Sequence, residues 1–156
     1  MNISENSRIW IYQSDRALSA EEQVQIQEIL KDFTSQWLAH GNQLAAGSEI
    51  RNDRFIILSV DEQLAGASGC SIDQSVKLMQ EIEQRFGISL FDRFNIAYRV
   101  GNEIRTADRA EFEDLIRTGV VTPDTIVYNN LVQTRKQLET NWKVPFKESW
   151  HAQVFG

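Results

Sequence analysis

The pattern of apolar and polar residues at the start of the chain predicts a buried strand followed by a long helix. Residues 8–13 read RIWIYQ, a continuous run of β-forming side chains that is typical of a strand covered on both faces. Ser19 and Glu22 have the spacing of a helix capping box. Apolar side chains then recur every three or four residues, at Ile26, Leu30, Phe33 and Trp37. We therefore expect a helix over residues 20–39.

A helix stop and a hairpin come next in the chain. His40 suits the negative end of a helix dipole, and Gly41 suits the left-handed conformation that closes helices. Residues 43–50 form a weak strand of small side chains, and residues 55–60 read FIILSV, a second continuous apolar run. Only residues 51–53 separate these segments, which is too short a connection for parallel strands, so an antiparallel hairpin is expected.

A second helix and an alternating strand follow the hairpin. Ser71 and Gln74 have capping-box spacing, and Gly87 marks the expected end of the helix. The apolar positions of this helix are Val76, Met79, Ile82 and Phe86. Residues 94–100 then alternate between apolar and polar side chains, which predicts a strand with one buried face.

The last third of the chain predicts shorter elements. The dipeptide Gly101-Asn102 favours a two-residue hairpin turn. Asp108 and Glu111 have the spacing that caps a short helix. A short strand at residues 125–128 and a helical turn at residues 134–140 are expected before an aromatic tail.

This order of elements predicts an α+β fold built on a ferredoxin-like βαββαβ sandwich over residues 8–100. The first and third strands are central in that topology, and the two continuous apolar runs occupy those places. The expected strand order is four, one, three, two, with both helices on one face. Residues 101–156 are then a C-terminal hairpin and small αβ extension packed on this unit, which gives a single compact domain overall.

Both central strands of the expected sheet are apolar on both sides, so the face that the helices leave exposed must also be buried by another part of the chain or by a partner. The aromatic tail is one candidate, and we expect Trp142 and Trp150 to be largely buried. A homodimer interface is the alternative.

Charge and cysteine content narrow the classes of function. The chain has 16 Lys plus Arg and 22 Asp plus Glu, a net charge of −6, which is the wrong sign for a nucleic-acid binder. Cys70 is the single cysteine, so neither an intramolecular disulfide nor a thiolate-based zinc site is possible. The start is polar and acidic, and no apolar run is long enough to span a membrane. We expect a cytoplasmic protein with no metal, no cofactor, no nucleic-acid partner and no membrane insertion.

Five stretches of the chain carry a resemblance to known proteins: RIWIYQSDRALSAEE, AGASGCSID, LFDRFNIAYR, DTIVYNNLVQTRKQLETNW and VPFKESWHAQVF. Together they resemble a family of short uncharacterised bacterial proteins of roughly this length, sometimes labelled ABC-transporter ATPase. That label implies a phosphate-binding loop, in which a lysine directly follows a glycine. The glycine-containing stretch 65–71 has no lysine before Lys77, so the P-loop is absent and we expect no ATPase activity.

The stretch from Gly66 to Ser71 is the main candidate site. Cys70 lies just before the expected second helix, where exposed N–H groups and the helix dipole stabilise a thiolate. The expected topology brings the end of the first helix to the same end of the sheet, so His40 could act as a base for Cys70. Main-chain N–H groups of the same loop could instead hold an anion. Its ligand-binding residues would be Gly66, Ser68, Gly69, Cys70 and Ser71. Small residues at a tight turn also serve packing alone.

The sequence therefore favours a non-enzymatic interaction or regulatory module. Such a module would form a homodimer or bind one protein partner. The alternative is small anionic-ligand binding or a thiol-dependent activity at the loop Gly66–Ser71.

Overall fold

The chain folds into two compact units. The computed structural model describes residues 4–63, 65–92 and 94–155. Unit 1 comprises Met1–Phe91 together with Gln133–Lys136, and unit 2 comprises Asp92–Val132 together with Gln137–Gly156. Unit 1 therefore contains a short segment from late in the chain.

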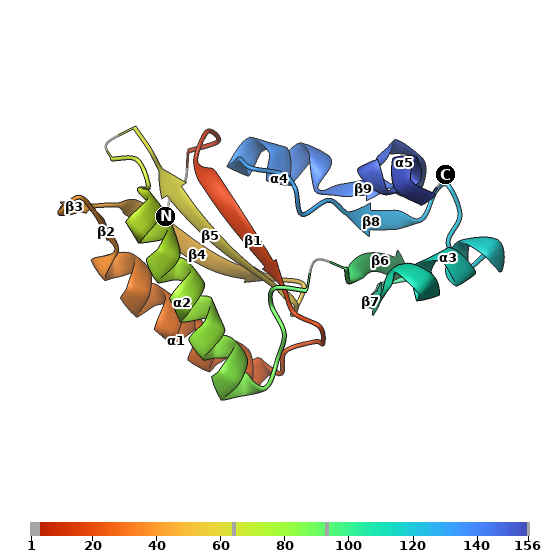
Figure 1. Ribbon diagram of the computed structural model, residues 1–156, viewed down its shortest axis with the longest axis horizontal. Helices are drawn as coiled ribbons and strands as arrows, with labels where there is room; N and C mark the ends of the chain where they lie inside the picture. Colours follow the sequence, from red (N-terminus) through yellow and green to blue (C-terminus); the bar gives the residue numbers. More distant parts are fainter. Residues whose placement is uncertain (1–3, 64, 93, 156) are drawn as a thin grey trace. The chain divides into compact units, whose positions relative to one another are not determined.

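Unit 1 consists of a three-stranded antiparallel sheet and two long helices (Figure 1). Its elements are β1 (Arg8–Gln13), α1 (Ala20–Gln36), β2 (Leu38–Ala39), β3 (Asn42–Gln43), β4 (Ala45–Arg51), β5 (Phe55–Asp61) and α2 (Gly69–Phe86). The strand order is β1-β5-β4, and β2 and β3 form a separate small hairpin. β5 is buried along its length except at Asp61, as its continuous apolar run predicted.

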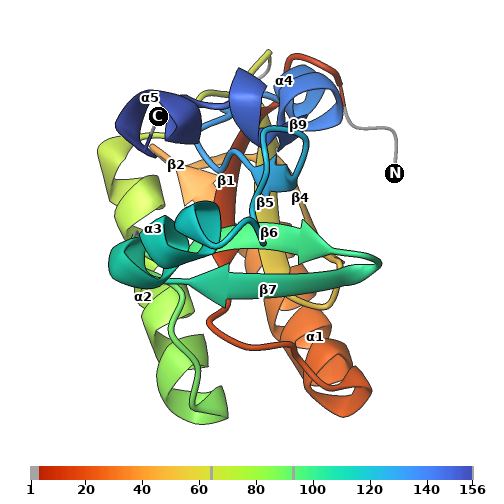
Figure 2. The same ribbon diagram turned by 90° about the vertical axis from the view of Figure 1, so that its right-hand side faces the viewer.

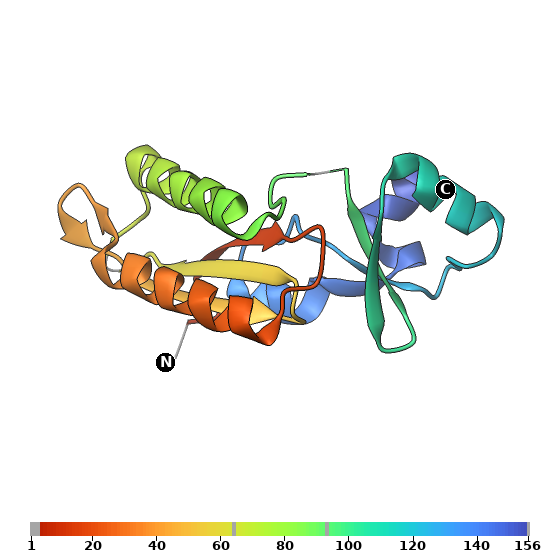
Figure 3. The same cartoon turned by 90° about the horizontal axis from the view of Figure 1, so that it is seen from below.

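Both long helices of unit 1 cover the same face of the sheet (Figures 1 and 3). The shared core includes Ile26 and Leu30 of α1, Met79 and Ile82 of α2, and Ile56, Leu58 and Val60 of β5. These are the apolar positions that the helical spacing and the FIILSV run predicted, and each is at most 1% exposed. Burial of this one continuous cluster provides the main driving force for folding unit 1.

The first helix ends earlier than the sequence pattern predicted. α1 stops at Gln36, and Trp37 already has extended backbone angles. His40 and Gly41 have φ angles of 52° and 79°, and they form the turn between β2 and β3 rather than the end of the helix. A hydrogen bond from the Leu44 N–H to the Trp37 carbonyl, 2.9 Å long, closes this hairpin. His40 therefore does not lie at a helix dipole.

The second helix begins earlier than predicted. Its N-cap is Ser68, whose hydroxyl accepts from the Ser71 N–H, while the Ser71 hydroxyl accepts from the Ser68 N–H. The expected cap, Ser71 with Gln74, is therefore wrong. The end of the helix is as predicted, because Gly87 adopts the left-handed conformation with φ of 64°.

Residues 94–100, expected as the fourth strand of the first sheet, belong to unit 2. β6 (Ile96–Val100) pairs with β7 (Glu103–Ala107) and β8 (Ile126–Tyr128) in a sheet of order β7-β6-β8-β9. The ferredoxin-like strand order is therefore wrong for this strand. The α+β class is confirmed, and so is the order one, three, two of the remaining strands.

The outer edge of β1, where the fourth strand was expected, is paired at its start with the late segment of unit 1. The Ile9 N–H donates to the Gln133 carbonyl at 2.9 Å, and the Arg135 N–H donates to the Ser7 carbonyl at 3.0 Å. The Arg135 guanidinium also forms an ion pair with Glu49 of β4. Gln133–Lys136 is thereby fixed to the sheet of unit 1.

Unit 2 has its own sheet and its own aromatic core. Besides β6, β7 and β8 it contains α3 (Arg109–Arg117), most of α4 (Arg135–Asn141), β9 (Lys143–Pro145), a short 3-10 turn (Phe146–Glu148) and α5 (Trp150–Phe155). Figure 2 shows the β6–β7 hairpin, which turns at Gly101 with a φ of 61°. Phe112 is fully buried and meets the rings of Tyr98, Phe146 and Phe155. The burial of Ile96 and Tyr98 in this cluster explains why β6 belongs here.

The aromatic tail is part of unit 2. Trp142 is 1% exposed, packs edge-on against Tyr128, and donates its ring N–H to Asn130 at 3.0 Å. Trp150 is half-buried and stacks on His151 with 3.8 Å between the ring centres. The predicted burial is therefore confirmed for Trp142 and only partial for Trp150.

Candidate functional site

The loop that the sequence singled out does not have the form that was expected. Cys70 lies in the first turn of α2, not in the loop before it, and its side chain is exposed. The ring N–H of Trp37 donates to the Ser71 carbonyl at 2.9 Å, so the end of α1 does lie beside the start of α2. His40 is exposed in the β2–β3 turn. Among the described residues, no hydrogen bond joins His40 to Cys70.

The N–H groups of this loop are largely engaged by the protein itself. The Ala67 N–H donates to the Glu62 carboxylate at 2.9 Å, and a side chain added at Gly66 would place its Cβ 3.0 Å from the same carboxylate. The N–H groups of Ser68 and Ser71 are bound by each other's hydroxyls. Glu62 thus provides negative charge where an anionic ligand was expected, which weighs against an anion site at this loop.

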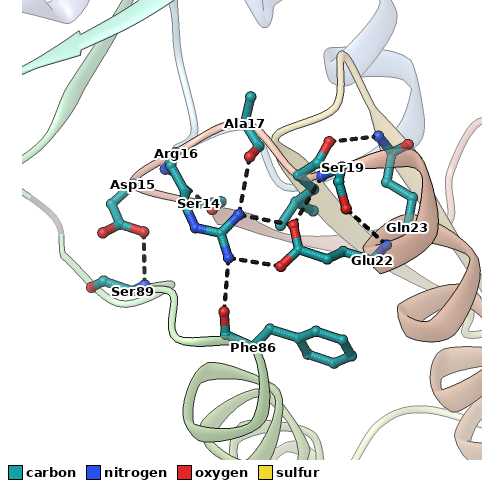
Figure 4. Close-up of polar contacts among 10 residues, drawn as sticks. Ser14, Asp15, Arg16, Ala17, Ser19, Glu22, Gln23, Phe86 and Ser89 are labelled. Atoms are coloured by element: carbon teal, nitrogen blue, oxygen red, sulfur yellow. Dashed lines mark hydrogen bonds and ion pairs between the residues drawn. The ribbon is translucent and has the colours of Figure 1, made fainter.

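A second polar cluster joins the start of α1 to the end of α2 (Figure 4). The Arg16 guanidinium donates to both carboxylate oxygens of Glu22, at 2.8 and 2.7 Å, and to the Phe86 carbonyl at 2.8 Å. The Asp15 side chain accepts from the Ser89 N–H at 2.9 Å. The hydrogen bond from Arg16 lowers the pKa of Glu22 to about 2. This cluster satisfies its own charges, so it has the character of a structural tie.

A cleft beside β4 is a candidate binding site in unit 1. Its volume is about 490 Å³, within the usual range of small-molecule sites. It is lined by the end of α1, by the start of β4 with the two residues before it, by the end of β5 and by the residue before β1. The lining residues are Ser7, Thr34, Ser35, Gln43, Leu44, Ala45, Ala46, Gly47, Ser59 and Asp61. We call this hollow the β4 cleft.

The small residues at the start of β4 make room for the cleft. Ala45, Ala46 and Gly47 follow one another on an edge strand of the sheet, where larger side chains would fill the space. Ala45 lies opposite Asp61, and Gly47 lies opposite Ser59. Because opposite residues of paired strands share a face, Ser59, Asp61 and Ala45 lie on one face of the sheet, and this is the face turned away from α1 and α2.

Ser7 extends this polar row on the other side of β5. β1 pairs with β5 so that Arg8 lies opposite Val60, and one residue earlier Ser7 comes opposite Asp61. The Ser7 side chain is fully buried, and its hydroxyl has no hydrogen-bond partner within residues 4–63, 65–92 and 94–155. Leaving a buried hydroxyl unpaired costs about 1–3 kcal/mol.

The far wall of the cleft is fixed in place by Gln43. Its amide N–H group lies 3.2 Å from both the Trp37 and the Leu44 carbonyls. The hydroxyls of Thr34 and Ser35 donate back to carbonyls within α1, at 3.2 and 2.8 Å. These contacts engage the polar side chains at the last turn of α1.

The charge of the cleft comes from Asp61. It is the one charged residue among the described residues of the lining, and one of its carboxylate oxygens accepts from the Gln63 N–H at 3.1 Å. Among the described residues, none of those that line the cleft is a cysteine, histidine, lysine or arginine. The cleft therefore offers hydrogen-bond acceptors and one negative charge to a ligand.

Sequence reasoning missed this cleft. Its residues come from four segments that are brought together only by the pairing of β1, β5 and β4 and by the packing of α1. The one local signal was the run of small residues at 45–47, which was interpreted as a weak strand. Ser7 carried no signal, because an unpaired hydroxyl cannot be recognised before its neighbours are known.

Comparison with protein families, with curated proteins and with solved structures finds no match to this chain. The resemblance to a family of short bacterial proteins therefore stays a prediction. Within the described part of the chain, no helix is long and apolar enough to cross a membrane. The same residues contain no group of three or more His, Cys, Asp or Glu that could hold a metal ion.

Proposed function

We propose that this protein is a non-enzymatic binding module whose ligand is a small polar molecule or side chain held in the β4 cleft. The observation that carries this proposal is the cleft itself, a hollow of about 490 Å³ whose described lining combines small residues with the Asp61 carboxylate. A hollow of this volume is within the usual range of small-molecule sites.

The composition of the lining supports binding rather than catalysis. A serine acts as a nucleophile when a neighbouring base removes its proton, and histidine or lysine usually fills that role. Asp61 is the one ionisable side chain that the described part of the chain contributes to the lining. A carboxylate is a weak base for this purpose, so the cleft has the groups to recognise a ligand and lacks the usual groups to transform one.

The alternative site at Gly66–Ser71 receives less support. Glu62 already accepts from the Ala67 N–H, and the caps of α2 use two further N–H groups of the loop. A homodimer or a single protein partner, and a cytoplasmic location, stay predictions of the sequence.

A ligand screen with a blocked variant tests the proposal. We would record amide NMR spectra of the full-length ¹⁵N-labelled protein with small neutral, cationic and anionic compounds. Binding in the cleft is expected to shift the signals of Ala45, Gly47, Ser59 and Asp61. Ala45→Phe places a large side chain in the exposed part of the lining and should abolish these shifts.

A matched control separates blocking from general disturbance. Ala20 is an exposed alanine of unit 1 outside the lining, so Ala20→Phe should bind as the unmodified protein does. If no compound of any charge class shifts the cleft signals, or if Ala45→Phe binds unchanged, the proposed function is wrong.

A further inference from the structure

We propose that two copies of this protein pair through β4 of unit 1, antiparallel about Ser48, to form one continuous sheet. This inference goes beyond the proposed function, because it concerns the backbone edge of the sheet and needs no small ligand. It follows from three properties of β4: its open outer edge, the match of its side chains to a second copy of itself, and the charge of Asp61 beside it.

The outer edge of β4 has backbone groups to offer to another strand. β4 pairs with β5 on one side, and no strand of the described residues pairs with it on the other. In an antiparallel ladder the N–H and C=O of one residue point to the same side, and that side alternates along the strand. The outward N–H of Ile9 fixes the alternation for β1, and the registers of the two strand pairs carry it to β4. The outward residues of β4 are therefore Ala46, Ser48 and Ile50.

β4 lacks the residues that usually prevent an edge strand from pairing with another chain. Natural proteins place lysine, proline or a bulge on such edges. β4 reads AAGSEIR, and all seven of its residues pair with β5 in one unbroken register. Its two charged side chains form an ion pair, with 3.0 Å between Arg51 Nε and Glu49 Oε2, so the strand carries no excess charge of one sign. An edge of this kind is suited to pairing with a further strand.

The side chains of β4 match those of a second, antiparallel copy of the same strand. When Ser48 lies opposite Ser48 of the second copy, each large side chain at one end of β4 meets a small one from the other end. The opposite pairs are then Ala45 with Arg51, Ala46 with Ile50, and Gly47 with Glu49. No two bulky side chains and no two like charges lie directly opposite each other in this register. The outward residues also face one another in three pairs, and each such pair exchanges two hydrogen bonds.

The second copy also brings a cation to Asp61. Ala45 lies opposite Asp61 on one side and, in the dimer, opposite Arg51 of the second copy on the other, so these three side chains form a row on one face. Ala45 is only a methyl group, and the long Arg51 side chain reaches over it to the Asp61 carboxylate. Arg51 Nε donates to Glu49, and a guanidinium has five N–H donors, enough for two carboxylates. No lysine or arginine of the described residues lines the cleft around Asp61, so the second copy supplies the missing positive charge.

The side of α1 next to β4 suits the same arrangement. Gln23 donates to the turn between β4 and β5, and Thr34 lines the cleft at the start of β4. Gln27 and Lys31 lie between them on the same side of the helix, and both are exposed. Val24, three residues before Gln27, is 57% exposed. A two-fold axis through Ser48 brings this side of α1 towards its counterpart, where burial of Val24 contributes to association.

Sedimentation equilibrium of the full-length protein over a series of concentrations tests for the dimer. The mass should approach twice the chain mass of 18.0 kDa as the concentration rises. Ser48→Pro removes an outward N–H that the β4–β5 pairing does not use, so it should prevent the dimer and preserve the fold. The matched control Ser48→Ala keeps this N–H and should dimerise as the unmodified protein does. A mass of one chain at every concentration, or a dimer that Ser48→Pro does not weaken, would overturn the inference.

A cysteine at the centre of the interface measures the register, and it decides the matter if Ser48→Pro does not fold. Cα atoms of a hydrogen-bonded antiparallel pair are about 5.5 Å apart, which is within the range of a disulfide. With Cys70→Ser as the background, Ser48→Cys should therefore give a disulfide-linked dimer on mild oxidation. Glu81→Cys, at an exposed position of α2 in the same background, is the control and should stay largely unlinked. Equal cross-linking of the two variants would contradict the pairing of β4 with itself.

The contact between Asp61 and Arg51 of the second copy is tested by a charge substitution. Asp61→Asn removes the charge and keeps the shape, and the contact occurs twice in the dimer. The dissociation constant of the dimer should therefore rise by at least about tenfold. Asp73→Asn makes the same change at an exposed position of α2 and should leave the constant unchanged. An unchanged constant for Asp61→Asn would show that the strands do not pair in this register, and the inference would be wrong.

These measurements are made without any small ligand, so they are independent of the proposed function. A monomer whose cleft binds a small molecule overturns the dimer and leaves the binding function intact. A dimer with the expected response to Ser48→Pro, whose cleft binds no compound, supports this inference and overturns the proposed function.

Discussion

The buried side chains of His151 and Ser7 differ in their hydrogen bonding. His151, in unit 2, is 2% exposed and lies with its Nδ1 3.2 Å from the Ser149 hydroxyl, which itself donates to the Phe146 carbonyl at 2.8 Å. Ser7, in unit 1, is fully buried and has no such partner among the described residues. The first arrangement offsets the cost of burying a polar side chain, whereas the second does not.

Burial of His151 makes the stability of unit 2 depend on pH. Desolvation lowers the pKa of His151 to about 4, against an ordinary value of 6.5. Between these values the unfolded chain binds the proton and the folded chain does not, so stability rises with pH. We expect this group to reduce the free energy of unfolding by about 3 kcal/mol as the pH falls from 8 to 4.

Urea unfolding between pH 4 and pH 8 measures this dependence. His151→Phe keeps an aromatic ring beside Trp150 and Phe112 and removes the titrating group. The difference in stability between this variant and the unmodified protein should shrink or reverse as the pH falls. A difference that is the same at both ends of the range would show that His151 does not contribute.

At the scale of single elements, the start of α2 shows how a buried side chain decides between two possible caps. Both Ser68 with Ser71 and Ser71 with Gln74 have capping-box spacing in the sequence. The structure uses the earlier pair. Ser71 is fully buried, and its carbonyl accepts from the Trp37 ring N–H. Tertiary contacts with α1 thus place Ser71 inside the helix.

Removal of this cap should destabilise unit 1 measurably. Ser68→Ala leaves the Ser71 N–H without its acceptor, and we expect a loss of about 1 kcal/mol. Ser68→Asp restores an acceptor at the N-cap and places a negative charge at the positive end of the helix, so it should recover most of the loss. Urea unfolding followed by circular dichroism compares the three proteins. Equal losses in both variants would mean that the cap contributes little.

The elements that the sequence predicted best are those with strong local signals. The capping boxes at Ser19 and Asp108 and the Gly101 turn are found where they were expected. The partner of β6 could not be predicted in this way. Its alternating pattern indicates one buried face, and it does not say whether that face meets the helices of unit 1 or Phe112 of unit 2.

At the scale of the whole molecule, each unit has an apolar cluster of its own. The cluster of unit 1 joins α1, α2 and the sheet, and that of unit 2 surrounds Phe112. Phe112→Ala should cost about 3–5 kcal/mol, because it leaves a cavity at a fully buried aromatic position. We expect the loss to appear in unit 2.

Hydrogen exchange locates this loss. In Phe112→Ala, amides of β6, β7 and β8 should exchange faster, while those of β1 and β5 keep their protection. Leu30→Ala, at a fully buried position of α1, is the reciprocal control and should expose the amides of unit 1. Equal deprotection of both sheets by either substitution would contradict the assignment of separate cores.

The candidate site could be predicted least of all. The thiol at Cys70 and the loop before it were visible in the sequence because glycine, serine and cysteine are familiar in catalytic turns. The β4 cleft exists because the residues at the start of β4 are small, and its lining forms only when β1, β5 and β4 pair. Such a site has no linear motif.

The hydrogen bonds between Ser7 and Arg135 and between Ile9 and Gln133 also affect the order of events during synthesis. β1 leaves the ribosome long before Gln133–Lys136 is synthesised. The outer edge of β1 therefore has no backbone hydrogen-bond partner at its start until that segment has been made. Long-range pairs of this kind slow folding, because a large loop must close before they form. The Ser7 side of the β4 cleft should therefore be among the last parts of unit 1 to reach its final structure, and a chain released early would carry it unfinished.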